Sequence, residues 1–213
     1  MLLVDSLLFA IQTWSDIQFA VGLVAQFSGN PGIAYLKAAK CILQYLKGTA
    51  NQYLVLGRQR EGDFDLVGWS DSNWAQDPND QRSTSSFIFD IAGSSVLWSS
   101  KKQSTVAISP VETKYIVSAN TTKEAVWLCT LLTELDSSPT TATVIYADNQ
   151  GYIALTNNPI SHFCAKHIDI WHYFIQEWIE HHKIGLSYVL TKEMLTDVFT
   201  KALPRETFEK FCA

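Results

Sequence analysis

The sequence has 213 residues, of which 47% are hydrophobic and 17% are charged. Such a chain can bury a sizeable core, and it is too apolar and too weakly charged to be a disordered protein. Its 16 basic and 21 acidic side chains give a net charge of -5, which argues against a protein whose main activity is indiscriminate binding to phosphate.

The charge is distributed unevenly along the chain. Residues 1–60 carry five basic and two acidic side chains (+3), whereas residues 61–213 carry eleven and nineteen (-8). We therefore expect two modules, 1–60 and 61–213. The four cysteines form no C-x-x-C pair, and the apolar N-terminus lacks a basic region, so we expect an intracellular chain, cytoplasmic or nuclear, without a secretion signal or membrane anchor.

The first module is expected to be helical. Residues 1–14 are apolar and predict a buried helix or strand. Apolar residues at helical spacing predict a helix over 17–27, ended by the SGNPG sequence at 28–32, and a second helix over 33–47 that closes at Gly48. Two helices joined by a short turn form a helical hairpin.

The second module begins with strands. Stretches rich in β-branched and aromatic residues predict three antiparallel strands over 66–71, 83–93 and 95–103. A long helix over 109–135 follows, because Ser109, Pro110 and Glu112 together form a capping box with proline in the first turn.

The rest of the chain alternates between strands and helices. We expect strands over 143–148 and 185–190, and helices over 150–158, 167–182 and 193–203. Strands followed by this alternation imply an α/β protein with a mixed sheet and helices on its faces.

Three acidic residues stand at the ends of these elements. Asp71 and Asp148 end two strands, and Asp197 lies near the start of the closing helix. If the two strands are neighbours, the three carboxylates converge at one edge of the sheet, where they suit Mg²⁺ and phosphodiester hydrolysis with two metal ions. The alternative is that each aspartate is a turn or cap residue.

Five motifs carry a resemblance to a known family. They are GWSDSNWAQDPNDQRSTSSF (68–87), LWSSKKQSTVAISPVETKYI (97–116), YADNQGYIALTNNP (146–159), KHIDIWHYFIQEWIE (166–180) and LTKEMLTDVFTKALP (190–204). Together they resemble the ribonuclease H domain of copia-type LTR retrotransposon polyproteins. Residues 1–60 resemble the C-terminal, thumb-side end of the reverse transcriptase in the same polyproteins.

The resemblance implies a ribonuclease H-like fold: a mixed five-stranded sheet, three antiparallel strands and then parallel ones, with helices on both faces and a helical hairpin before it. It further implies hydrolysis of RNA in RNA/DNA hybrids, with Mg²⁺ or Mn²⁺ held by three aspartates and one glutamate. Asp71, Asp148 and Asp197 match the aspartates. The residue at the glutamate position, just before Tyr115, is Lys114.

Glu112 could replace the missing glutamate only through an unwound or shifted first helical turn, since two residues turn a helix by about 200° and its capping role is sufficient. A charged Lys114 about 5 Å from a divalent ion would meet a repulsion of about 7 kcal/mol at an effective dielectric of 20. Three outcomes are open: the ammonium empties the metal site, it pairs with Asp71 and Asp148 in place of a cation, or it reaches solvent and leaves one metal bound.

Two hypotheses about function follow. The first is a ribonuclease H with impaired catalysis. The second is an inactive remnant that binds nucleic acid or another polyprotein segment. Two other groups of residues have ordinary explanations: the five histidines suit helix surfaces, and the tryptophans Trp69 and Trp74 suit packing, although both flank Asp71 where bases could pass.

Overall fold

The computed structural model describes residues 2–57, 65–139, 141–157 and 166–212. Its centre is a five-stranded sheet with the strand order β3-β2-β1-β4-β5. The first three strands are antiparallel neighbours, and β4 and β5 run parallel to β1. The strands are β1 (Leu66–Asn73), β2 (Thr84–Ile91), β3 (Ser94–Lys102), β4 (Thr143–Ala147) and β5 (Ile184–Tyr188). The predicted α/β class and mixed sheet are confirmed.

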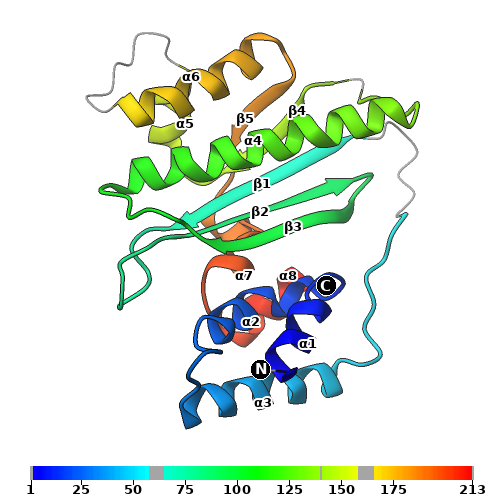
Figure 1. Cartoon of the computed structure of the whole chain (residues 1–213). Coiled ribbons are helices and arrows are strands. Elements are labelled where there is room, and N and C mark those ends of the chain that lie inside the picture. The colour runs from blue at the N-terminus through cyan, green and yellow to red at the C-terminus, as the bar shows by residue number, and fades with distance from the viewer. Residues whose placement is uncertain (1, 58–64, 140, 158–165, 213) are drawn as a thin grey trace.

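One face of this sheet is covered by the long helix α4 (Pro110–Glu134). As the capping box predicts, the Ser109 side chain accepts a hydrogen bond from the Glu112 backbone N–H at 3.1 Å. Helices α5 (Gln150–Thr156) and α6 (Lys166–Glu180) lie beyond α4 on the same side of the molecule (Figure 1). The core between α4 and the sheet is apolar and consists of Leu66, Phe89, Ala125, Leu128, Leu132, Ile145 and Ile184.

The opposite face is covered by both ends of the chain (Figure 1). These ends comprise α1 (Leu2–Ala10), a 3-10 turn (Ser15–Ile17), α2 (Gln18–Ala25), α3 (Ile33–Gly48), a 3-10 turn (Thr191–Glu193), α7 (Asp197–Thr200) and α8 (Arg205–Cys212). Helices α2 and α7 contact the strands, and α3 packs on α2. The indole N–H of Trp98 on β3 donates to the carbonyl of Ile11 at 3.0 Å, and Lys102 donates to Gln26 at 3.3 Å. Helices therefore lie on both faces, as predicted.

The N-terminal helices have a core of their own, formed by Leu7, Ile17, Val21, Val24, Ala39 and Ile42. Helices α2 and α3 are in contact, as the predicted hairpin requires. The expectation that residues 1–14 are buried is wrong for much of α1, because Leu7 is its buried residue while Leu2 and Phe9 are more than 80% exposed.

The C-terminal end differs from the sequence prediction. No continuous helix spans 193–203, and α8 was not predicted. The backbone is extended at Met194 and again at Lys201, so the helical part is limited to α7, and α8 begins after Pro204, whose carbonyl accepts from the Phe208 N–H at 3.0 Å.

The prediction of surface histidines is wrong for His172, which is 1% exposed and packs against Tyr115 at 5.8 Å between ring centroids. Helix α6 buries this residue because it packs on α4 and α5. His181 and His182 are exposed, as expected. His162, the side chain of His167 and the boundary at residues 60 and 61 lie outside what the structure describes. None of the described helices is long and apolar enough to cross a membrane.

Gly68 on β1 provides a test of the core packing. A Cβ atom at this position would lie 2.6 Å from a ring carbon of Phe89, whereas a Cβ at Gly185 on β5 would meet nothing within 4 Å. We expect Gly68→Ala to lower the free energy of unfolding by about 1–3 kcal/mol through overpacking, measured by urea denaturation. The matched variant Gly185→Ala should change it much less. Equal effects of the two variants would contradict the close approach of Gly68 and Phe89.

Candidate functional site

The ends of two neighbouring strands place Asp71 and Asp148 at one edge of the sheet. Asp71 lies near the carboxyl end of β1, and Asp148 directly follows β4, which is the parallel neighbour of β1. Asp71 is only 5% exposed. A buried carboxylate is costly unless a positive charge or hydrogen bonds compensate for its lost hydration.

Lys114 supplies that charge. It lies in the second turn of α4, and its Nζ atom is 2.5 Å from Asp71 Oδ1 and 3.0 Å from Asp148 Oδ1. Lys114 is itself only 9% exposed. The ammonium therefore bridges the two aspartates, which is the second of the three outcomes considered from the sequence.

Helix α7 brings the third aspartate to the same cluster. Asp197 is 5% exposed and forms an ion pair with Lys201 at 2.7 Å. From the same helix, the Thr200 hydroxyl donates to Asp71 Oδ2 at 3.1 Å. The Ser86 hydroxyl lies 3.3 Å from the backbone carbonyls of both Asp71 and Thr196. These contacts hold α7 against the ends of β1 and β2.

The electrostatics of the cluster follow from burial and from the two lysines. Burial opposes the charged form of Asp71, but Lys114 outweighs it and holds the pKa of Asp71 below its ordinary value. Burial likewise opposes the charged form of Lys114, and the two aspartates nevertheless raise its pKa. The pKa of Asp197 is raised by burial, against the effect of Lys201, and the neighbouring Asp71 and Asp148 add to the rise.

Glu112 points elsewhere, as its helical position predicted. Its Oε2 atom accepts a hydrogen bond from the Ile108 backbone N–H at 2.7 Å. The partner is one residue earlier than the Ser109 N–H of a standard capping box. Glu112 thus stabilises the start of α4, two residues from Lys114, and its carboxylate is engaged there.

The divalent metal that the family resemblance implies does not fit this arrangement. The bridging position between Asp71 and Asp148 is taken by the Lys114 ammonium. Among the residues that the structure describes, no group of three or more His, Cys, Asp or Glu side chains is arranged to hold a metal ion.

Two contributors to the cluster were missed in the sequence. Lys201 stands four residues after Asp197, a spacing that predicts an ion pair on a helix, so this contact could have been found. Thr200 could not have been found, because its partner Asp71 is 129 residues away in the chain.

The sheet order, the long helix between the third and fourth strands, and an acidic cluster at the carboxyl ends of β1 and β4 define a ribonuclease H-like domain. Among solved structures, the chain is similar to LC11-RNase H1, isolated from compost, with 10% identity and a TM-score of 0.49. That match covers 70% of this chain and 99% of the other.

Sequence comparison finds homologues among retrotransposon polyproteins. The chain is 38% identical over 211 residues to the retrovirus-related Pol polyprotein from transposon RE1 of Arabidopsis thaliana, which covers 99% of this chain and 14% of that protein. It is 36% identical over 207 residues to the corresponding polyprotein from transposon TNT 1-94 of Nicotiana tabacum, covering 97% and 15%. No family model matches. The homologues of this chain are therefore copia-type retrovirus-related Pol polyproteins, and the chain spans about 15% of the length of these relatives.

Removal of Lys114 tests the ion pair. We expect Lys114→Met to lower the free energy of unfolding by about 3–5 kcal/mol, because it leaves Asp71 buried without a counter-charge. Lys101→Met is the matched control, since Lys101 is an exposed lysine on β3 and its loss should cost less than about 0.5 kcal/mol. Urea denaturation of both variants near neutral pH measures the difference. Similar losses would show that the pairing contributes nothing specific.

The stability difference between wild type and Lys114→Met should depend on pH, and the direction follows from the pKa shifts of Asp71 and Lys114. In the wild type the lowered pKa of Asp71 contributes stability that is present above about pH 4 and is lost as pH falls through the folded value. The raised pKa of Lys114 contributes stability that is present below about pH 10 and is lost as pH rises through the folded value.

In Lys114→Met, the charge that offsets burial is absent, so burial should raise the pKa of Asp71 against the Thr200 hydrogen bond that remains, and the variant loses stability as pH rises above about 4. The difference in the free energy of unfolding between wild type and variant should therefore increase from pH 4 towards neutrality. Denaturation curves at a series of pH values measure this difference. A difference that stays constant or decreases would contradict the pairing of Lys114 with Asp71.

Proposed function

We propose that this chain is a ribonuclease H-like segment of a retrotransposon polyprotein that has kept the fold and has lost efficient cleavage of RNA in RNA/DNA hybrids. One observation carries the proposal: the Lys114 ammonium is buried between Asp71 and Asp148. Lys114 stands where the family resemblance implies a fourth carboxylate. Its ammonium occupies the place of a metal ion but cannot supply the chemistry of a metal ion.

The net charge of the cluster supports this proposal. With three ionised aspartates against Lys114 and Lys201, the net charge is -1. A glutamate at position 114 would change it to -3. A divalent cation is attracted in proportion to this charge, and in a partly buried site the interaction is weakly screened. Lys114 thus both blocks the bridging position and removes most of the attraction.

We also infer that the chain is divided into two parts. Residues 1–60 correspond to the C-terminal end of a reverse transcriptase, and residues 61–213 to the ribonuclease H-like domain. The separate core of the N-terminal helices and the match to Pol polyproteins along 99% of the chain support this division.

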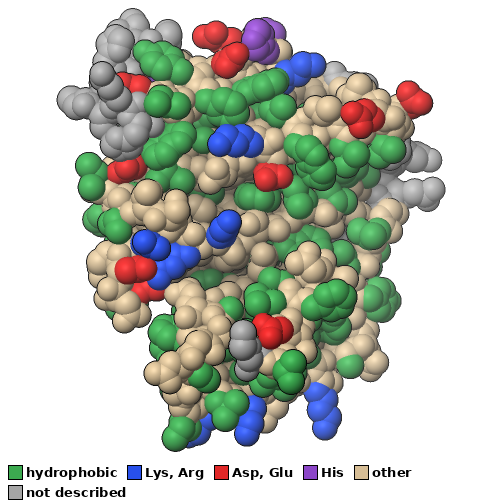
Figure 2. Space-filling view, in the orientation of Figure 1, with side chains coloured by type: hydrophobic (Ala, Val, Ile, Leu, Met, Phe, Trp, Pro, Cys, Tyr) green, Lys and Arg blue, Asp and Glu red, His purple; other side chains and the backbone are tan. Residues whose placement is uncertain are grey.

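The partner of an active relative would be an RNA/DNA hybrid, and a non-cleaving module could retain it or bind another polyprotein segment. On the face shown in Figure 2, the Lys and Arg side chains of the described residues are scattered among hydrophobic and acidic ones. Tight binding of a nucleic-acid backbone depends on clustered basic residues, so this face gives little support to such binding.

The decisive experiment compares cleavage by the wild type and by Lys114→Glu. With an RNA/DNA hybrid in Mg²⁺ or Mn²⁺, we expect the wild type to cleave at least about 100-fold more slowly than Lys114→Glu, the scale on which loss of one electrostatic group slows an enzyme. The double variant Lys114→Glu with Asp148→Asn should lose the recovered activity. Calorimetric titration with Mg²⁺ should show binding to Lys114→Glu and not to the wild type.

Robust cleavage by the wild type that is abolished by Asp148→Asn would refute the proposal, because the lysine would then be tolerated. Absence of cleavage in the wild type and in Lys114→Glu, when the variant binds Mg²⁺ and remains folded, would show that the loss of activity does not originate at position 114.

A further inference from the structure

A second feature lies beside the acidic cluster, on the sheet face opposite α4. Side chains alternate between the faces of a strand, so Trp69 shares a face of β1 with Asp71, and Tyr146 lies on β4 two residues before Asp148. On this face there is a pocket of about 580 Å³, within the size range of small-ligand sites. It is lined by Trp69, Tyr146, Tyr188, Val189, Leu190, Glu193 and Leu195.

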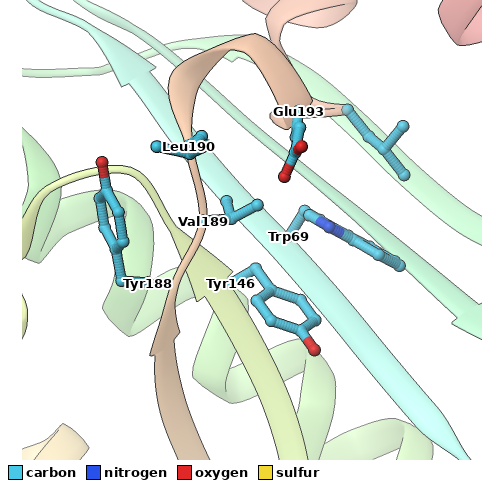
Figure 3. Close-up of a pocket in the computed structure, with 7 residues that line it drawn as sticks. Trp69, Tyr146, Tyr188, Val189, Leu190 and Glu193 are labelled. Carbon is cyan, nitrogen blue, oxygen red and sulfur yellow. The ribbon is translucent and has the colours of Figure 1, made fainter.

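The floor and walls of the pocket are aromatic and aliphatic. Trp69 and Tyr146 are register partners on adjacent parallel strands, and their rings stack with centroids 5.6 Å apart and planes inclined by 29°. Val189 and Leu190 come from the segment that leaves β5, and Tyr188 lies on the far side of Val189 from Trp69 (Figure 3). Leu190 is 55% exposed, so the apolar surface is open to a partner.

Glu193 is the charged member among the described residues that line the pocket. Its carboxylate points inward above Trp69 and Val189 (Figure 3). The same segment also lies beside Asp148, because the Thr191 hydroxyl donates to Asp148 Oδ2 at 3.4 Å while the other oxygen of Asp148 is paired with Lys114. The pocket therefore combines an aromatic surface with negative charge.

The aromatic surface and the carboxylate together indicate which kind of ligand the pocket can bind. A purely apolar group would cover Glu193 without giving it a partner, which is costly. A nucleotide could stack on Trp69, but its phosphate would approach Glu193, within a module that carries nineteen acidic and eleven basic residues. A cation satisfies both elements, because it is attracted to the face of an indole ring and to a carboxylate.

We propose that this pocket binds an arginine side chain presented by a partner polypeptide. The planar guanidinium stacks on an aromatic ring, is weakly hydrated, and matches a carboxylate with two parallel hydrogen bonds, whereas a lysine ammonium is a strongly hydrated point charge. The arginine would lie on Trp69 with its N–H groups directed to Glu193. This site goes beyond the proposed function and does not depend on whether Lys114 prevents cleavage.

The test uses the full chain and a defined probe, N-acetyl-arginine methylamide. The indole N–H signal of Trp69, assigned with Trp69→Phe, is followed by ¹H–¹⁵N NMR during titration. We expect a saturable shift with a Kd on the order of a millimolar, and binding weakened roughly fivefold in Glu193→Gln. N-acetyl-lysine methylamide should bind roughly fivefold more weakly than the arginine probe.

Trp127 provides an internal control, because it is a 52% exposed tryptophan on α4 with Glu124 three residues earlier. Its indole signal should not move in a saturable way, and Glu124→Gln should leave the binding at Trp69 unchanged.

Three results would overturn the proposal. One is a Trp69 signal that does not respond to the arginine probe, and another is binding that Glu193→Gln leaves intact. The third is a saturable response to guanosine 5′-monophosphate that matches or exceeds the response to arginine, which would reassign the pocket to a nucleotide.

Discussion

A buried positive charge between two strand ends organises this domain. Asp71 at the end of β1 is almost inaccessible to water, and its ionised form requires a compensating charge in the interior. Lys114 provides it from α4 and at the same time contacts Asp148 after β4. One ammonium thereby links the long helix to both of the neighbouring parallel strands at the edge of the sheet where the strands end.

The buried cluster around Lys114 also positions the short helix α7 near the end of the chain. The free oxygen of Asp71 accepts from Thr200, and Asp197 on the same short helix pairs with Lys201. Helix α7 is only four residues long and has little stability of its own. Its position depends on these polar contacts and on the Ser100 hydroxyl, which donates to the Phe199 carbonyl. The cluster thus acts as a structural junction between four elements that are distant in the sequence.

Much of this arrangement could be predicted from the sequence because it depends on local patterns. Strand alternation and the capping residues around Ser109 located the sheet and α4, and the helical rotation between Glu112 and Lys114 indicated which of them faces the aspartates. The unpredicted parts depend on tertiary contacts. Burial of His172 follows from the packing of α6, and the position of the N-terminal helices on the second sheet face depends on contacts such as Trp98 with Ile11. No local pattern encodes either of them.

The pairing of Lys114 with the aspartates also has a genetic consequence. Lysine and glutamate codons differ only at their first base, so a single transition interconverts them at this position. The rest of the framework, from the strand ends to α7, already holds the neighbouring carboxylates in place. One point mutation at position 114 would therefore suffice to place a fourth carboxylate beside Asp71 and Asp148.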